Sequence, residues 1–507
     1  MVQSLANAQQ DSIALRYASK ISMDSLKKNL SVLASDEYEG RETGRRGQKL
    51  AAAYIVNNFE RNNVGAPSVD GHYQYYFLDE KTPGIAQLSV GCKKLQNKKD
   101  YYYFPKDINA EKIITHEIIF LGYGIDDKNY NDYTGADVKG KSVMMLSGEP
   151  INKDSTSIVT GNKNNIYWND RLKFHKASEK GVSLVLIVRD SVAKDVLKNE
   201  SRIESPSMKL ISGEKPMPSV IYISKETANK ILSGKTTTEQ AIAEVLKTKK
   251  PAKNLIVKKK IKLTSKNQKQ QISAENVFGF IEGEELKDEV IVISAHYDHL
   301  GIVKGEIYNG ADDDGTGTAT LLELSKIFAQ AKAEGHGPKR SILFIAFSGE
   351  EKGLLGSSYY VKNPIIPLEK TVCDLNIDMV GRIDEFHQTN QQYVYLIGAD
   401  KLSKDLHNIS DSINTTYCNL SLDYKYNDEK DPNRFYYRSD HYNFAKNKIP
   451  VIFYFSGVHE DYHQPTDDIE KIRFDKVAII ARLVFLTAWD VANREQRLLL
   501  DDDKKTK

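Results

Sequence analysis

The sequence contains little cysteine and no long apolar run. Its three cysteines are widely spaced, so they form neither a disulfide framework nor a paired-cysteine metal site, and we expect free thiols. The most apolar stretch, Val477–Ala492, is interrupted by Arg482 and Asp490 and is too short to span a membrane. We therefore expect a buried helix near the C-terminus and no membrane span.

The sequence also lacks an excess of charge of either sign. Lys and Arg number 71 and Asp and Glu number 69, a net charge of +2 that gives no electrostatic reason to expect a nucleic-acid or membrane partner. The N-terminal MVQSLANAQQ has no basic region followed by an apolar core, so it does not resemble a signal peptide. We expect an exported protein, periplasmic or extracellular, whose signal peptide is absent from this sequence. A cytoplasmic location is the alternative, and no oligomeric state is predicted.

Changes in character along the chain predict three regions. Residues 1–110 contain amphipathic helices over Asp24–Ala34 and Gly47–Arg61 and then a strand. Residues 111–250 contain short β-rich runs and one helical piece, and we expect an inserted domain. Residues 251–507 continue the main domain. Around the second boundary, Lys247–Lys269 partly alternates apolar residues with lysines, which favours an exposed edge strand over a nucleic-acid patch.

The region after Asn276 alternates strands with helices, which predicts an α/β fold with a mixed, mostly parallel sheet flanked by helices. The expected strands are Asn276–Ile281, Glu289–Ser294, Ser341–Phe347, Asp374–Ile377, Tyr393–Ile397 and Pro450–Phe455. The expected helices are Gly315–Ala333, Leu354–Val361, Leu402–Ile413 and Phe474–Asn493. Ligands of such sheets bind beyond the carboxyl ends of the strands.

Histidine and acidic residues cluster at these strand ends. His296 and Asp298 follow one strand and face the same way in an extended segment, so His296 is either a structural histidine or a metal ligand held by Asp298. Glu350 and Glu351 follow a second strand, as solvated loop acids or as a ligand beside a proton acceptor. Asp378 lies in an apolar run, where an acid is rarely buried unless it is paired or metal-bound.

Two further segments carry candidates. Asp312–Asp314 precede a helix, where carboxylates either cap the N-terminus or bind metal. Val458–Asp467 contains HEDYH, but the two histidines of a zincin motif need a helix, and the strand, glycine and proline around this one argue against it. One of His459 and His463 remains a loop ligand. Together these donors favour zinc and a two-metal site with one bridging carboxylate.

The motifs then match a known family. HYDHLG, GADDDGTG, SGEEKGLLGS, NIDMVG, RSDHYNFAKNKIPV and YHQPTDD, in this order, resemble the M28 family of di-zinc aminopeptidases. The inserted segment resembles a protease-associated domain. The resemblance implies a peptide-hydrolysing enzyme with a zinc-exopeptidase fold and two zinc ions per chain. It also implies that a hydroxide bridging the two ions attacks the N-terminal peptide bond, and that the Asp313–Asp314 peptide bond is cis.

The resemblance also assigns roles to residues. Asp313 would bridge the two ions, one of which would take Glu351 and His463 and the other His296 and Asp378. Glu350 would be the general base and Asp298 would orient His296. Candidate substrate contacts are Tyr436, Arg438 and Tyr462.

Two other readings of the fold stay open. One is a glutaminyl cyclase-like enzyme with a single zinc, which the presence of both His296 and Asp378 argues against. The other is a non-catalytic, receptor-like protein on the same fold, which loss of ligands would indicate. The sequence predicts neither the preferred N-terminal residue nor the role of the inserted domain.

Overall fold

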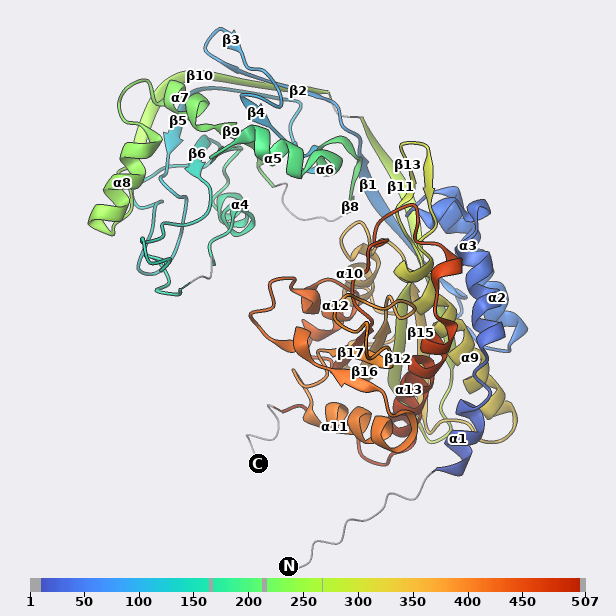
Figure 1. The fold of residues 1–507 in the computed structure, drawn as a ribbon. Helices are drawn as coiled ribbons and strands as arrows, with labels where there is room; N and C mark the ends of the chain where they lie inside the picture. Colours follow the sequence, from blue (N-terminus) through green and yellow to red (C-terminus); the bar gives the residue numbers. More distant parts are fainter. Residues whose placement is uncertain (1–10, 164–166, 212–216, 267, 502–507) are drawn as a thin grey trace, which may run out of the picture. The chain divides into compact units, whose positions relative to one another are not determined.

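The computed structural model describes residues 11–163, 167–211, 217–266 and 268–501. The chain divides into two units (Figure 1): unit 1 consists of Met1–Phe77 and Ile272–Lys507, and unit 2 of Leu78–Gln271. Unit 2 extends beyond the predicted 111–250 at both ends. The reason is strand pairing, since strands before residue 111 and after residue 250 belong to its sheet.

Unit 1 is built on a mixed sheet whose strands follow the order β18-β17-β19-β16-β12-β15-β11-β1. Its central strands β19, β16, β12 and β15 are parallel to one another, whereas β17 is antiparallel to β19 and β11 is antiparallel to β15. The strands are β1 (Tyr73–Lys81), β11 (Lys269–Ile281), β12 (Leu286–His296), β15 (Arg340–Phe347), β16 (Thr371–Ile377), β17 (Tyr393–Ile397), β18 (Ser421–Asp423) and β19 (Val451–Phe455). All predicted strands of this region are confirmed.

Both faces of this sheet are buried, which explains the continuous apolar runs of its strands. Ile291 and Ile293 of β12 pack into one core, and Val290 and Val292 pack into another on the opposite face. The first core includes α1 (Ser12–Ala18), α2 (Met23–Leu33), α3 (Arg46–Arg61), α9 (Gly317–Ala333), α11 (Lys404–Ile413) and α13 (Phe474–Asn493). The second includes α10 (Leu355–Lys362) and α12 (His441–Ala445) (Figure 1).

Unit 2 has its own sheet, in the order β3-β2-β10-β5-β6-β7-β9-β4. Its strands are β2 (Ile85–Val90), β3 (Lys93–Lys94), β4 (Tyr101–Tyr102), β5 (Lys112–Phe120), β6 (Ser142–Leu146), β7 (Leu184–Arg189), β9 (Ser219–Ser224) and β10 (Leu255–Lys266). The last four residues of β1 pair with β8 (Ser207–Leu210). The helices are α4 (Asp170–Glu179), α5 (Val192–Lys198), α6 (Glu200–Glu204), α7 (Lys225–Leu232) and α8 (Thr238–Thr248). Only α4 was predicted.

The lysine-rich strand β10 is not at an edge, so the prediction of an edge strand is wrong. It pairs antiparallel with β2 on one side and with β5 on the other. Val257, Ile261 and Leu263 are buried, while Lys258 and Lys262 are exposed. Because successive side chains of a strand point to opposite faces, the lysines lie on the solvated face of the sheet.

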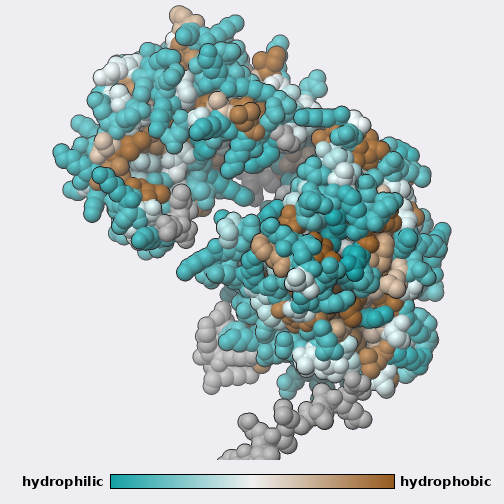
Figure 2. Space-filling model, in the orientation of Figure 1, coloured by the Kyte–Doolittle hydropathy of each residue, from teal (hydrophilic) through white to brown (hydrophobic). Residues whose placement is uncertain are grey.

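Hydrophilic residues cover most of the visible face of each unit, and hydrophobic residues form small patches (Figure 2). Among the described helices, none combines the length and apolar character needed to cross a bilayer. Cys92, Cys373 and Cys418 are all free thiols, as predicted.

Candidate metal centre

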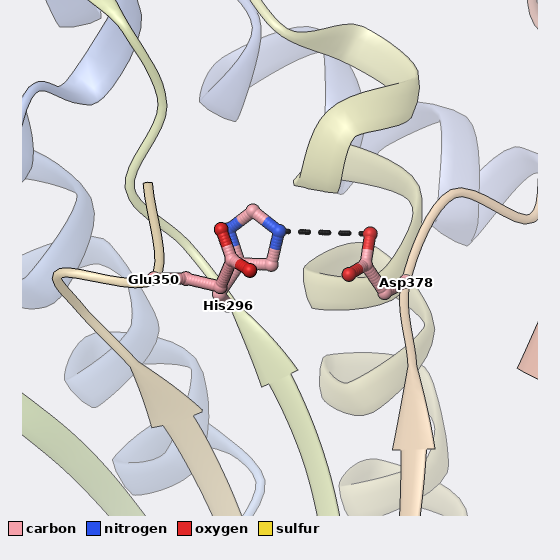
Figure 3. A group of neighbouring side chains, drawn as sticks. All are labelled: His296, Glu350 and Asp378. Carbon is pink, nitrogen blue, oxygen red and sulfur yellow. Dashed lines mark ion pairs between the residues drawn. The ribbon is translucent and has the colours of Figure 1, made fainter. Parts of the chain in front are cut away.

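The site lies at the carboxyl ends of the parallel strands of unit 1. His296 is the last residue of β12 and pairs in register with Phe347, the last residue of β15. Glu350 and Glu351 follow β15, and Asp378 follows β16 directly. Parallel strands that end together deliver these side chains to one edge of the sheet (Figure 3).

The first group of donors consists of His296, Asp313 and Asp378. His296 Nε2 lies 3.3 Å from Asp313 Oδ1 and 3.6 Å from Asp378 Oδ1. Donor atoms of His296, Glu350 and Asp378 all lie within 4.8 Å of one another. Asp378 is held in place from behind, because its Oδ2 accepts a hydrogen bond of 2.7 Å from Ser439 Oγ.

The second group shares Asp313 with the first. His463 Nε2 lies 3.0 Å from Asp313 Oδ2 and 3.2 Å from Glu351 Oε1. Asp313 therefore turns one carboxylate oxygen to each group, which is how a carboxylate bridges two cations. The other histidine of HEDYH, His459, lies 3.2 Å from Asp312 Oδ2 instead.

The three consecutive aspartates have different positions. Asp313 faces the donors, whereas Asp314 accepts hydrogen bonds from the backbone of His296, Gly317 and Met379. It thus caps α9 and ties together the loops after β12 and β16. The Asp313–Asp314 peptide bond is cis, as the family resemblance predicted.

Asp298 does not reach His296 through its carboxylate as expected. His296 Nδ1 lies 3.0 Å from the Asp298 backbone carbonyl and 3.8 Å from Asp298 Oδ1. The carboxylate instead accepts hydrogen bonds from Thr43 Oγ1 at 2.6 Å and from the Glu350 backbone N–H at 3.2 Å. An imidazole whose second nitrogen is held by a carbonyl is a common arrangement for a metal ligand, and the Asp298 side chain fixes the loop that carries Glu350.

The electrostatics of the site fit bound cations. In the described part of the chain, the ion-pair partners of Asp313, Asp378 and Glu351 are all histidines. The nearby Arg41 is buried, but its guanidinium donates to backbone carbonyls of Leu33, Tyr297, Asn309 and Gly310. Buried carboxylates are stable only when they are paired or bound to metal, so these residues fit divalent cations.

The pKa shifts in the site follow from the burial of carboxylates and histidines close to one another. Burial raises the pKa of Glu350 well above its ordinary value, and the neighbouring Glu351 raises it further. For His463, burial lowers the pKa, but the adjacent carboxylates of Asp313 and Glu351 outweigh burial and raise it to about 10. The same two carboxylates would favour a divalent cation in place of that proton.

A pocket with one apolar wall opens at the first group, and His296, Asp313 and Asp378 are part of its lining. Its lining includes Glu350, and its apolar wall consists of Met379, Phe435, Phe453, Phe455 and Val458. Two predicted substrate contacts, Arg438 and Tyr462, also line it, and Arg438 Nη2 donates to Tyr462 Oη at 3.1 Å. The third, Tyr436, is not in the lining and packs between the apolar clusters behind it.

Sequence reasoning missed some residues of the site. His299 is fully buried, and its Nδ1 lies 3.0 Å from Glu351 Oε1. The signal was available, because His299 is the second histidine of HYDHLG. Asp467 lies in the YHQPTDD motif, but the sequence predicted no role for it. Its Oδ2 accepts hydrogen bonds from the backbone N–H groups of Asp312 and Asp313 and so positions Asp313.

The fold and the donor set together define an α/β domain with a candidate metal site at the carboxyl ends of its parallel strands. A family model described as Peptidase family M28 matches residues 276–488. These residues therefore match the family that their motifs predicted.

Individual proteins are similar to the chain in fold or in sequence. An aminopeptidase from Aneurinibacillus sp. strain AM-1 has a similar fold, with a TM-score of 0.57 and 17% identity over 96% of this chain and 98% of that one. Aminopeptidase YwaD of Bacillus subtilis (strain 168) is 25% identical over 44% of this chain and 46% of its own length. Leucine aminopeptidase 1 of Penicillium rubens is 27% identical over 40% of this chain and 53% of its own length. The chain thus spans about half the length of these curated relatives.

Proposed function

We propose that the protein is a zinc-dependent aminopeptidase that hydrolyses the N-terminal peptide bond of peptides and binds two zinc ions per chain. The observation that carries this proposal is the position of Asp313, with one oxygen 3.3 Å from His296 Nε2 and the other 3.0 Å from His463 Nε2. Mixed imidazole and carboxylate donors suit zinc. A pair of zinc ions, when bound, polarises the scissile carbonyl and lowers the pKa of water.

Glu350 is proposed as the general base. It lines the pocket, whereas Glu351 is absent from the lining and its side chain is 6% exposed. The hydrogen bond from the Glu350 backbone N–H to Asp298 Oδ1 fixes the backbone that carries the two adjacent acids. A carboxylate at this position takes the proton of the attacking water and passes it to the leaving amine.

The pocket favours peptides with an apolar N-terminal side chain. Its apolar wall buries such a side chain against Phe435, Phe453 and Phe455. Arg438 and Tyr462 lie at the pocket and are placed to contact the polar atoms of the peptide. We therefore expect leucyl and phenylalanyl substrates to be cleaved faster than glycyl or aspartyl ones.

Measurements on the full chain test this function. Elemental analysis after loading with zinc and dialysis gives zinc per chain, and a panel of aminoacyl p-nitroanilides gives the activity. We expect two zinc ions, hydrolysis that a chelator abolishes and zinc restores, and a preference for apolar residues. One zinc with cyclisation of N-terminal glutamine would favour the glutaminyl cyclase-like alternative. Bound zinc without hydrolysis of any substrate, including peptides, would favour the receptor-like one.

A further inference from the structure

His299 lies next to the second group of donors, and the proposed ligand set does not include it. The side chain is fully buried. Its Nδ1 is 3.0 Å from Glu351 Oε1 and 3.8 Å from Asp313 Oδ2. Donor atoms of His299, Asp313 and Glu351 all lie within 4.8 Å of one another.

The contact between His299 and Glu351 is close but is not aligned as a hydrogen bond. Within the described residues, neither ring nitrogen of His299 has a hydrogen-bond partner, and Glu351 Oε1 has none either. Buried polar atoms are rarely left without a partner. A cation between the imidazole and the carboxylate would satisfy both atoms.

The fold holds the His299 ring in this position. The His299 backbone N–H donates to the Arg41 carbonyl at 3.3 Å, and its chain segment pairs with Glu42. Gly310 packs directly against the ring, and a Cβ at Gly310 would collide with it. The imidazole is therefore fixed by packing, which is what a preorganised ligand requires.

The spacing of four donor atoms fits one tetrahedral zinc ion. Ligands about 2.0–2.1 Å from zinc stand about 3.3 Å apart in a tetrahedron. His463 Nε2 lies 3.0 Å from Asp313 Oδ2 and 3.2 Å from Glu351 Oε1, and His299 Nδ1 lies 3.8 Å and 3.0 Å from the same two oxygens. The four separations lie on both sides of the tetrahedral value.

We propose that His299 is a fourth protein ligand of the cation held by Asp313, Glu351 and His463. The proposal rests on the metal centre proposed above. It makes the two subsites unequal, since the other has three protein donors, His296, Asp313 and Asp378. Closed four-ligand zinc sites are typical of tight binding, and sites with an open position are typical of catalysis. The subsite with His299 therefore fills first and empties last, and the other subsite meets the substrate.

X-ray absorption spectroscopy of the full chain loaded with one equivalent of zinc tests the proposal without any substitution. We expect two imidazoles on this first zinc, from His299 and His463. A single imidazole on it would overturn the proposal. Two imidazoles together with no aminopeptidase activity would support the ligand assignment and overturn only the proposed function, so the two failures are distinguishable.

A substitution gives the second test. Loss of a residue that only orients a ligand typically lowers metal affinity 10–100-fold. We expect His299→Ala to lower the affinity for the first zinc by more than about 100-fold, measured by chelator competition, and to remove one imidazole from its spectrum.

His441→Ala is the matched control. His441 is also fully buried in unit 1 with both ring nitrogens unpartnered among the described residues, but it stacks on Phe453. Its replacement should leave the affinity unchanged. If His299→Ala weakens zinc binding no more than His441→Ala does, the proposal is wrong.

Discussion

The sheets of both units contain parallel strands, but the acidic side chains near these strands have different ion-pair partners in the two units. In unit 2, Arg189 at the end of β7 lies 3.1 Å from Asp170 and 2.6 Å from Asp195, and the buried Lys173 lies 3.7 Å from Asp170. In unit 1, Asp313, Glu351 and Asp378 have histidines as their ion-pair partners in the described part of the chain.

This difference separates a structural network from a candidate metal centre. Arginine carries a permanent charge, so Asp170 and Asp195 of unit 2 need no other cation. Neutral imidazole supplies a lone pair but no charge. Histidines that bind metal are neutral, so the buried acids beside them would retain a net negative charge that divalent cations would balance. Strand topology alone does not distinguish the two cases, and the identity of the partner does.

The largest effect is expected from Asp313→Asn in unit 1. The amide keeps one acceptor oxygen but loses the charge, and it cannot hold two cations. We expect zinc content to fall to near zero and aminopeptidase activity to fall to background. Elemental analysis and leucyl p-nitroanilide hydrolysis provide the check. Retention of two zinc ions in this variant would refute the bridging role of Asp313.

Glu350→Gln should have the next largest effect. The glutamine keeps the volume but cannot accept the proton of water. Because general acid–base catalysis contributes about 10²–10⁴-fold, we expect kcat to fall by that factor while zinc content stays at the wild-type level. The control is Glu351→Gln next to it, which should lose zinc. If the activity of Glu350→Gln falls only in step with its zinc, the assignment of the base is wrong.

Much of unit 1 could be predicted from the sequence because its local and tertiary signals agree. The ranges of β17 and α13 match the prediction to the residue, since an apolar run and a helical period mark each element within a regular α/β alternation. The predicted ligands were found through motifs and lie together in the structure. His299 was missed because the motif was used to assign only its first histidine, although the second stands in the same motif, and the burial of His299 is seen only in the structure.

Unit 2 was predicted less well, because its pairings connect segments distant in sequence. The pairing of β2 with β10 joins residues before 91 to residues after 260, and no local pattern indicates it. The lysines of β10 indicated an edge strand, yet alternation with Val257, Ile261 and Leu263 is equally typical of a central strand with one solvated face.

Asp132 of unit 2 is an exception to this comparison between the two units. It is buried, its Oδ2 accepts from the Ile125 N–H at 3.0 Å, and its Oδ1 has no hydrogen-bond partner within the described residues. Burial raises its pKa from the ordinary 3.8 to about 7. The folded state thus binds the proton more tightly than the unfolded state, and the resulting stability is full below about pH 4 and is lost as the pH rises through 7.

We therefore expect Asp132→Asn to stabilise unit 2 at pH 8 but not at pH 4. Since one pKa unit corresponds to 1.36 kcal/mol, the gain is about 4 kcal/mol at most. Trp168 fluorescence in a Trp489→Phe background reports on unit 2 during urea unfolding, because each unit holds one tryptophan. The control Asp190→Asn removes an exposed acid and should change nothing. An equal effect of Asp132→Asn at both pH values would contradict the assignment.

The smallest effect is expected from Asp170→Asn, the matched counterpart of Asp313→Asn. Asp170 accepts hydrogen bonds from Ser147 Oγ and the Gly148 N–H and lies 3.1 Å from Arg189. Burial lowers the pKa of Lys173 to about 8 against the opposing charge of Asp170. Without that charge its pKa falls further, so Lys173 loses its proton near neutral pH instead of remaining buried and unpaired. Because loss of the Lys173 proton avoids a buried unpaired charge, we expect the free energy of unfolding of unit 2 to fall by only about 1–3 kcal/mol. This is the usual cost of removing a buried hydrogen-bonding partner.

The zinc content and the aminopeptidase activity of Asp170→Asn should equal those of the wild type, since Arg189 and Lys173 rather than a metal neutralise Asp170. Loss of zinc on Asp170→Asn would mean that the acids of unit 2 also hold a cation, and the distinction between the two units would fail.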